Sequence, residues 1–298
     1  MEYWLPLFFV AVIGFALLIY IILDGYDLGV GILLGLADED EKDQMIASIG
    51  PFWDANETWI VLGVGVLMIG FPAAYGLVLT TLYLPATLML MGLVLRGVSF
   101  DFRAKAKTEN RRMWNRLFTA GSLIAATSQG WMLGTYVMGL ESSILSYAFS
   151  LGIALALPAL YIMLGCGWLI MKAEGSLYRK SIHWAQWTVF PMGVGIFLIS
   201  IATPLISEII ADKWFTLPAA IGLLPIPITT MIAYAVIVWV LWHERILEAG
   251  FGWLIFVSLI IICLMSALGL AYSIYPDIVI DKMTIWDTAS STESLRFT

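Results

Sequence analysis

Long uncharged hydrophobic runs, separated by short polar segments, dominate this chain. A membrane-spanning helix needs about 20 mostly apolar residues, and eight runs meet that length. They predict transmembrane helices at about residues 5–24, 57–74, 76–95, 117–138, 145–170, 187–209, 217–241 and 251–273. The apolar stretch 28–36 leaves two alternatives for the first helix. Either that helix is long and tilted, or the stretch forms a separate interfacial or re-entrant piece.

Composition points to the same class of protein. Of 298 residues, 61% are hydrophobic and 12% are charged, and the mean hydropathy is +0.91. A soluble fold of this size could not bury that much apolar surface, so we predict an all-α polytopic membrane protein. The first run has neither preceding basic residues nor a small-residue cleavage site, which predicts a retained helix rather than a signal peptide. The net charge of -7, without a basic domain, argues against nucleic-acid binding.

Basic residues are distributed unevenly between the polar segments. The segment between the third and fourth predicted spans holds seven of them: Arg96, Arg103, Lys105, Lys107, Arg111, Arg112 and Arg116. Basic loops face the cytoplasm, and alternation then places 12 of the 15 Lys and Arg residues on that side. The N-terminus and the segment after the last span are therefore predicted to face outward.

Two pairs of acids lie where predicted spans meet the cytoplasmic side. Asp24 and Asp27 follow the first run, and Asp54 and Glu57 precede the second. The i, i+3 spacing puts each pair on one helical face, and ionisable residues at membrane depth are candidates for function. The four acids are predicted to converge on one vestibule suited to a proton relay. The alternative is that they cap helices at the interface; spacing alone favours capping, most of all for Glu57.

Two tryptophans accompany these acids. Trp53 directly precedes Asp54, and Trp59 lies about one and a half turns further into the span. Most tryptophans of the chain fall near predicted span ends, where they are typical interfacial anchors. Trp59 fits that role less well, because it lies inside the acids.

The remaining polar candidates have structural interpretations. Arg96, Asp101 and Arg103 are predicted to form a positive flank with a local ion pair, although Arg96 lies closest to the apolar run. Gln129, in the middle of the fourth predicted span and followed by Gly130, predicts a helix–helix contact rather than a ligand site.

Groups that could perform redox or hydrolytic chemistry are few. The two histidines, His183 and His243, fall at cytoplasmic ends of spans, and the two cysteines, Cys166 and Cys263, have no metal-type spacing. No phosphate-binding loop, dinucleotide fingerprint or nucleophile elbow occurs. The chain alone is therefore predicted to be non-catalytic and to need a partner, and haem binding by this chain is the less favoured alternative.

Four motifs together resemble subunit II of cytochrome bd-type quinol oxidases, in the same order and over the whole chain. They are Asp24-Gly25-Tyr26-Asp27-Leu28-Gly29-Val30-Gly31, Gly50-Pro51-Phe52-Trp53-Asp54-Ala55-Asn56-Glu57-Thr58-Trp59, Arg96-Gly97-Val98-Ser99-Phe100-Asp101-Phe102-Arg103, and Tyr275-Pro276 with Thr284-Ile285-Trp286-Asp287-Thr288-Ala289-Ser290-Ser291. Gln129-Gly130 with Leu133-Gly134 is similar to the shorter, cyanide-insensitive branch of that family.

The resemblance implies an architecture of two four-helix bundles. The first, within 1–140, would contain the acidic motifs, the second would cover 141–275, and 276–298 would form an outward-facing polar tail. Relatives usually have a ninth, peripheral helix after the tail motif. This sequence stops at Thr298, before any such helix. Either the chain is genuinely short or the sequence is truncated. With eight spans both termini are expected to face outward, whereas a ninth would return the C-terminus to the cytoplasm.

The resemblance also implies a function. The chain would be a haem-free partner of subunit I, which carries the quinol site and haems b558, b595 and d. The complex, in a prokaryotic plasma (inner) membrane, would oxidise quinol and reduce dioxygen to water with cytoplasmic protons. Trp53 and Asp54 match the family's proton-entry residues, and Trp59 matches a tryptophan at the opening of an oxygen channel. Glu57 stands where some relatives have Gln, so no family role transfers to it. A bound quinone or lipid, and a small single-helix accessory subunit, are compatible with the resemblance.

A function of another class remains as the alternative. The acidic cluster could couple protons to transport in a stand-alone secondary transporter. Such transporters typically contain matching pairs of helices broken by Gly or Pro, and the two halves of this sequence show no such pair.

Overall fold

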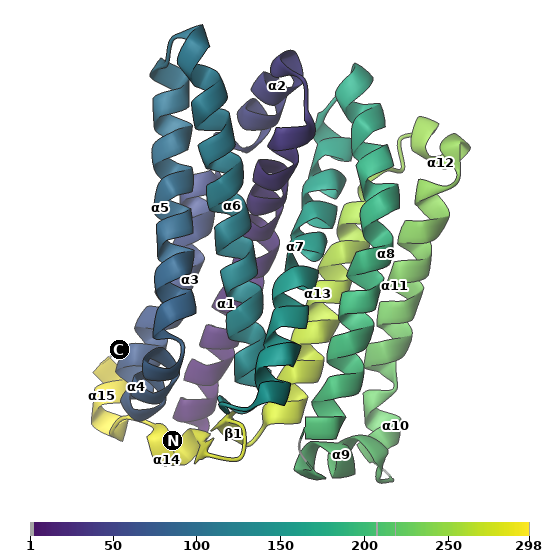
Figure 1. The fold of residues 1–298 in the computed structure, drawn as a ribbon. Helices are drawn as coiled ribbons and strands as arrows, with labels where there is room; N and C mark the ends of the chain where they lie inside the picture. Colours follow the sequence, from purple (N-terminus) through teal and green to yellow (C-terminus); the bar gives the residue numbers. More distant parts are fainter. Residues whose placement is uncertain (1–2, 207, 218, 298) are drawn as a thin grey trace.

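Long helices running side by side form most of the molecule (Figure 1). The computed structural model describes residues 3–206, 208–217 and 219–297. The long helices in this part of the chain are α1 (Trp4–Leu33), α3 (Trp53–Gly70), α5 (Tyr83–Lys105), α6 (Thr108–Val137), α7 (Ile144–Lys172), α8 (Gly175–Ile206), α11 (Pro225–Leu241) and α13 (Trp253–Ile274). The predicted all-α fold class is therefore confirmed.

Short elements connect and cap the long helices. They are the 3₁₀ turn η1 (Leu34–Leu36), α2 (Glu39–Ile49), α4 (Pro72–Thr81), α9 (Glu208–Phe215), α10 (Ala219–Leu223), α12 (Glu244–Glu248), β1 (Asp277–Val279), β2 (Met283–Thr284), α14 (Ile285–Thr288) and α15 (Thr292–Phe297). Strands β1 and β2 pair antiparallel in a two-stranded sheet.

The protein is a multi-pass membrane protein, but eight spans are not confirmed. Among the described residues, six helical segments are long and apolar enough to cross a membrane, or seven if α2 and α3, bent by 50° at their junction, form one span. Helix α6 falls outside this set, since its central turns carry polar residues such as Ser122 and Gln129. A membrane span must be both long enough and apolar enough, and α6 is long enough but not apolar enough.

The structure decides between the two alternatives for the first helix. Helix α1 continues without interruption to Leu33, so the stretch 28–36 is neither a re-entrant loop nor a separate piece. Its last turns are apolar because they are covered by protein: Leu28 and Val30 have no exposed surface. Helix α1 packs against α3, α6, α7 and α13 and is the central helix of the molecule.

One further expectation needs correction, and one helix was not predicted. The span predicted at 76–95 is divided at Leu82 into α4 and α5, and α5 continues to Lys105. Helix α4 begins at Pro72, which is favoured at the first position of a helix because it has no N–H to leave unpaired. Helix α2 was not predicted, although its start has a recognisable signal: the backbone N–H of Asp38 donates to the Glu41 carboxylate at 2.9 Å.

Glycines allow α1 and α7 to approach closely. A Cβ atom at Gly29 would overlap the backbone carbonyl of Tyr161, and one at Gly165 would lie 2.7 Å from the carbonyl carbon of Gly29. Close backbone contact of this kind is typical of helix pairs in membranes, where small residues let dispersion and polar contacts act.

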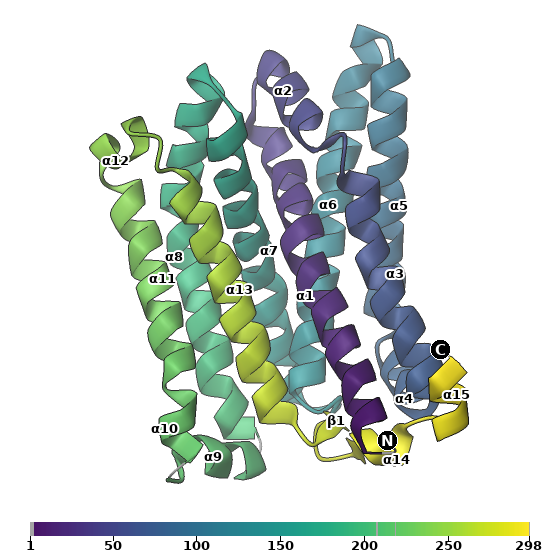
Figure 2. The same cartoon turned by 180° about the vertical axis from the view of Figure 1, so that it is seen from behind.

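The two ends of the helix array differ in their connections. Figures 1 and 2 show α2 and α12 at one end, and both termini with β1, α14 and α15 at the other. The tail is ordered: the Tyr136 hydroxyl donates to the carbonyl of Ile278 at 2.6 Å, and the Ser290 N–H donates to the carbonyl of Gly70 at 2.8 Å. These contacts fix the tail against α6 and the end of α3.

Gly165→Ala tests the close crossing of α1 and α7. We expect the free energy of unfolding to fall by about 1–3 kcal/mol, because an overpacked helix contact must open. Gly152→Ala, on the same helix but with no heavy atom within 4 Å of the added Cβ, should leave stability unchanged or slightly raised. Thermal unfolding in detergent measures both, and equal stability of the two variants would contradict this packing.

Candidate functional site

A buried arginine joins three helices. Arg96 of α5 is only 1% exposed, and its Nη2 donates to Oδ1 of Asp24 on α1 at 2.5 Å. The same nitrogen donates to Oε1 of Glu57 on α3. A buried charge is tolerated only when it is paired and hydrogen-bonded. These ion pairs therefore fix the relative positions of α1, α3 and α5 at this level.

The backbone around Arg96 explains why its side chain can reach these acids. Gly121 of α6 faces the backbone of α5, and a Cβ there would lie 2.8 Å from the Arg96 nitrogen. The absence of a side chain lets α5 lie directly on α6. On another side, the ring centroid of Trp53 lies 5.9 Å from the guanidinium carbon, within the range of a cation–π contact.

A second buried acid is held by an amide. Asn56 of α3 donates from Nδ2 to Oδ2 of Asp27 at 2.8 Å and to the Tyr26 hydroxyl at 3.0 Å. Asp27 has no exposed surface and Asn56 is 6% exposed. Asn56 was not among the predicted site residues. Its position between Asp54 and Glu57, in the same helical turn, was the available signal.

Several polar atoms of this cluster have no hydrogen-bond partner among the described residues. They are Oδ2 of Asp24, Oδ1 of Asp27, and Nε and Nη1 of Arg96. Nearly all buried polar atoms in proteins are satisfied by protein or by ordered water, and internal waters occupy positions of this kind. Two carboxyl groups, those of Asp24 and Glu57, share the Arg96 guanidinium, and the third, that of Asp27, is held by Asn56, so the cluster also contains more acids than cations.

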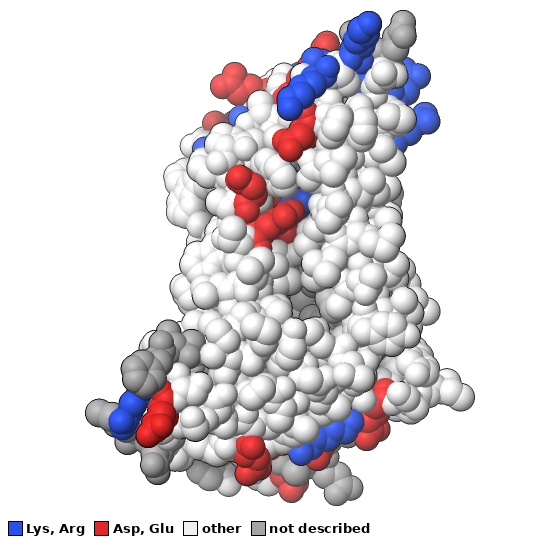
Figure 3. Space-filling model, turned by 90° about the vertical axis from the view of Figure 1, so that its left-hand side faces the viewer, with Lys and Arg blue, Asp and Glu red and all other residues white. Residues whose placement is uncertain are grey.

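The predicted convergence of four acids holds in part. Asp24, Asp27 and Glu57 come together inside the helix array, whereas Asp54 is exposed in the first turn of α3. One Asp54 oxygen accepts the N–H of Ala55 at 2.8 Å. Asp54 therefore fits the capping alternative, but Glu57, predicted to be the most typical cap, does not, because it pairs with Arg96. Figure 3 shows the side of the molecule that lies on the left in Figure 1. Acidic side chains appear there below the charged upper end, in an otherwise mostly uncharged band.

A buried polar network extends from this cluster along α1. Gln129 of α6 donates from Nε2 to the Tyr20 hydroxyl at 2.7 Å and accepts the Tyr161 hydroxyl at 2.5 Å. Tyr20 lies one turn before Asp24, on the same face of α1. Gln129 thus makes the interhelical contact predicted for it, and it joins α1, α6 and α7. Tyr20 and Tyr161 were missed, because an isolated tyrosine in an apolar run has no distinguishing pattern.

The local ion pair predicted for Arg96, Asp101 and Arg103 is wrong. Asp101 is exposed and pairs with no side chain among the described residues. Arg103 instead donates to Oδ1 of Asn115 at 2.6 Å and to Oδ1 of Asp43 at 2.7 Å. The reason is helical geometry: α5 continues through this segment, and residues five apart lie about 140° around the axis from each other.

Trp59 is partly buried against α1. Its ring meets Phe15 edge to face, with 6.1 Å between the centroids. This contact involves no polar group of the cluster.

The histidines of this chain do not fit the axial role that haem requires. Both are exposed. Nε2 of His183 accepts the Trp187 N–H at 3.1 Å, and Nδ1 of His243 lies 2.7 Å from the carbonyl oxygen of Trp239. In the described part of the chain, no three His, Cys, Asp or Glu side chains form a group that could hold a metal ion.

Curated relatives share sequence with part of this chain. Cytochrome bd ubiquinol oxidase subunit 2 of Bacillus subtilis is 34% identical over 142 residues, which cover 47% of this chain and 40% of that protein. Cytochrome bd-I ubiquinol oxidase subunit 2 of Escherichia coli K12 is 28% identical over 200 residues, 61% of this chain and 52% of that protein. The chain thus matches only about half the length of these relatives.

The comparison with solved structures concerns the fold. A chain of the bd oxidase from Geobacillus thermodenitrificans superposes with a TM-score of 0.79, covering 98% of this chain and 91% of that one, at 18% sequence identity. The family model for cytochrome bd terminal oxidase subunit II matches residues 5–298. This match spans every element that carries the cluster, and the chain belongs to the cytochrome bd terminal oxidase subunit II family.

Proposed function

We propose that this chain is the haem-free subunit of a quinol oxidase that reduces dioxygen to water, and that it supplies a proton path to that reaction. The observation that carries the proposal is the cluster of the buried Asp24 and Arg96 with the partly buried Glu57, which adjoins the exposed Asp54 on α3. The reaction in this proposal is taken from the family. Carboxyl groups at membrane depth are costly, and proton transfer would explain their presence.

The sidedness of the membrane supports a cytoplasmic entry. The basic end of the helix array, with α2 and α12, holds most Lys and Arg residues, and basic segments stay in the cytoplasm. Both ends of the chain then face outward from a prokaryotic inner membrane. Asp54 lies near the basic end, at the start of α3, where cytoplasmic protons are available.

The proton path follows the acids in order of burial. Asp54 takes a proton from the cytoplasmic side and passes it to Glu57, one turn further along α3. The Arg96 guanidinium links Glu57 to Asp24, and the unpaired oxygen of Asp24 receives the proton directly or through water. Trp53, against the guanidinium, screens this segment from lipid, and Asp27 provides a second buried carboxyl. In this proposal, Tyr20 and Gln129 continue the hydrogen-bonded route inward.

The oxygen chemistry requires a partner. In this proposal the partner, subunit I, holds the haems b558, b595 and d and the quinol site, as the family resemblance implies; the two exposed histidines of this chain, each in a local contact with a tryptophan, agree with that assignment. The haems, when bound there, supply electron transfer and oxygen binding. The outer faces of α3 and α5 carry exposed apolar side chains, among them Val61, Met91 and Val94. We propose that this face contacts the partner, with Trp59 near an oxygen entry.

Asp54→Asn tests the proton entry. We expect oxygen-dependent quinol oxidation by the purified complex to fall at least about tenfold, because the amide cannot carry a proton, while assembly and haem content remain normal. Asp40→Asn, at an exposed acid of α2 on the same end, should keep full turnover. Oxygen consumption and a pH-sensitive dye in proteoliposomes measure turnover and proton uptake. Normal turnover and normal proton uptake in Asp54→Asn would contradict the role of Asp54 in proton entry.

Arg96→Gln tests the buried ion pairs. We expect a loss of about 3–5 kcal/mol in stability, because the fully buried Asp24 and the partly buried Glu57 lose their shared counter-charge. Adding Asp24→Asn to Arg96→Gln should recover part of the loss, since one uncompensated charge is removed. Denaturant unfolding of the four members of this double-mutant cycle measures the coupling. Strictly additive losses would show that Arg96 and Asp24 do not interact.

A further inference from the structure

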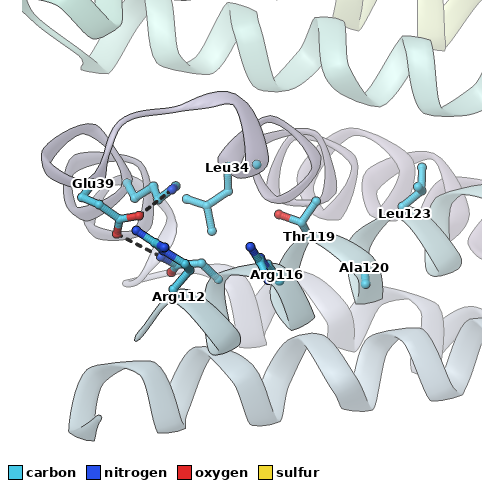
Figure 4. A pocket seen from close by; sticks show the side chains of 10 residues that line it. Leu34, Glu39, Arg112, Arg116, Thr119, Ala120 and Leu123 are labelled. Atoms are coloured by element: carbon cyan, nitrogen blue, oxygen red, sulfur yellow. Dashed lines mark hydrogen bonds and ion pairs between the residues drawn. The ribbon is translucent and has the colours of Figure 1, made fainter. Parts of the chain in front are cut away.

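A cavity opens at the basic end of the molecule, apart from the acidic cluster. It has a volume of about 570 Å³ and lies between η1, α2 and α6. Its polar wall carries Glu39, Lys42, Arg112 and Arg116, and its apolar wall includes Leu34, Ala120 and Leu123. In Figure 4, Glu39 and Arg112 lie at one end and Leu123 at the other. The cavity is therefore amphipathic along its length.

The charge of this cavity is not balanced by the protein. Glu39 is engaged by Lys42 at 2.9 Å and by Asn115 at 3.4 Å. Arg112 and Arg116 pair with no carboxylate among the described residues. Three cations and one carboxylate line the cavity, which leaves two positive charges. The adjacent Arg111 differs, because it lies 3.6 Å from Asp43.

The apolar end shows how a ligand would enter. Leu123 is 44% exposed, and Ile124 beside it on α6 is 37% exposed. Exposed apolar side chains on a helix of a membrane protein can be covered by lipid tails or by a partner, and here their continuity with a basic cavity favours lipid. The cavity thus joins the hydrocarbon region to a pair of arginines at the membrane surface. Guanidinium groups suit phosphate oxygens, which they can contact with two hydrogen bonds.

We propose that this cavity binds an anionic phospholipid of the inner leaflet. Arg112 and Arg116 hold the phosphate, Lys42 and Thr119 lie beside the headgroup, and the first part of an acyl chain follows Ala120 and Leu123. The volume is within the range of ligand sites, and basic pockets on the cytoplasmic side of helices take such headgroups. The site is independent of the proton path.

The double variant Arg112→Gln/Arg116→Gln tests the headgroup contacts. The complex purified through this chain is delipidated and titrated with phosphatidylglycerol or phosphatidylcholine of equal chain length, and native mass spectrometry counts the bound lipids. We expect the wild type to retain phosphatidylglycerol preferentially. The double variant should bind it about 25-fold more weakly, because each basic side chain contributes about fivefold.

A matched control separates local binding from overall charge. Arg179→Gln/Arg245→Gln removes the same charge from exposed residues at the same end, outside the cavity, and should bind phosphatidylglycerol like the wild type. Equal losses in the two double variants, or equal retention of both lipids by the wild type, would overturn the site.

A third variant tests the acyl-chain part with both arginines intact. Ala120→Phe fills the apolar half of the cavity, so lipid retention should fall while the fold, followed by thermal unfolding, is kept. Inorganic phosphate in large excess should not displace the lipid, because it has no chain to bury. Displacement by inorganic phosphate, or unchanged retention in Ala120→Phe, would show that no lipid chain occupies this cavity.

Discussion

The structure depends on one buried cation shared by two carboxylates. Arg96 lies inside the helix array and binds Asp24 and Glu57, which come from the first and third helices of the chain. Burying a charge is costly, and the cost falls only when opposite charges and hydrogen bonds surround it. The arrangement of α1, α3 and α5 is thus coupled to the protonation and hydration of these side chains. The proposed proton site therefore lies at the same place as the ion pairs that connect these helices.

Helix α1 connects this site to the rest of the molecule. It contacts four other helices, and its buried surface carries Tyr20, Asp24 and Asp27. Close packing on α7 at Gly29 fixes the depth of these side chains. Polar groups at the centre of the array can therefore form a continuous network, since no lipid contacts them. The basic cavity lies beyond this network, where η1 and α2 leave α1 and meet α6.

The pattern of hydrophobic and polar positions predicted much of the fold. It gave the all-α membrane class and placed most long helices, because the bilayer requires apolar segments of nearly fixed length. It failed at Leu82 and at α2. A break between two apolar helices changes no hydropathy, and a charged helix at the membrane surface has no apolar length signal. Helix α6 is long but contains polar residues, and one of them, Gln129, is hydrogen-bonded to a tyrosine of α1.

By itself, the sequence determined which residues would be costly to bury. Acids and an arginine beside apolar runs must be paired or functional. Only the tertiary structure decided the pairing. Arg96 is 72 residues from Asp24 and 39 from Glu57, and its nearby candidate, Asp101, points elsewhere on the helix. Ion pairs form between side chains that packing brings within a few ångströms. Helix packing depends on contacts such as that of Gly29 of α1 with the backbone of α7, which no local sequence pattern specifies. The candidate residues were therefore visible in the sequence, but their chemistry was set by the fold.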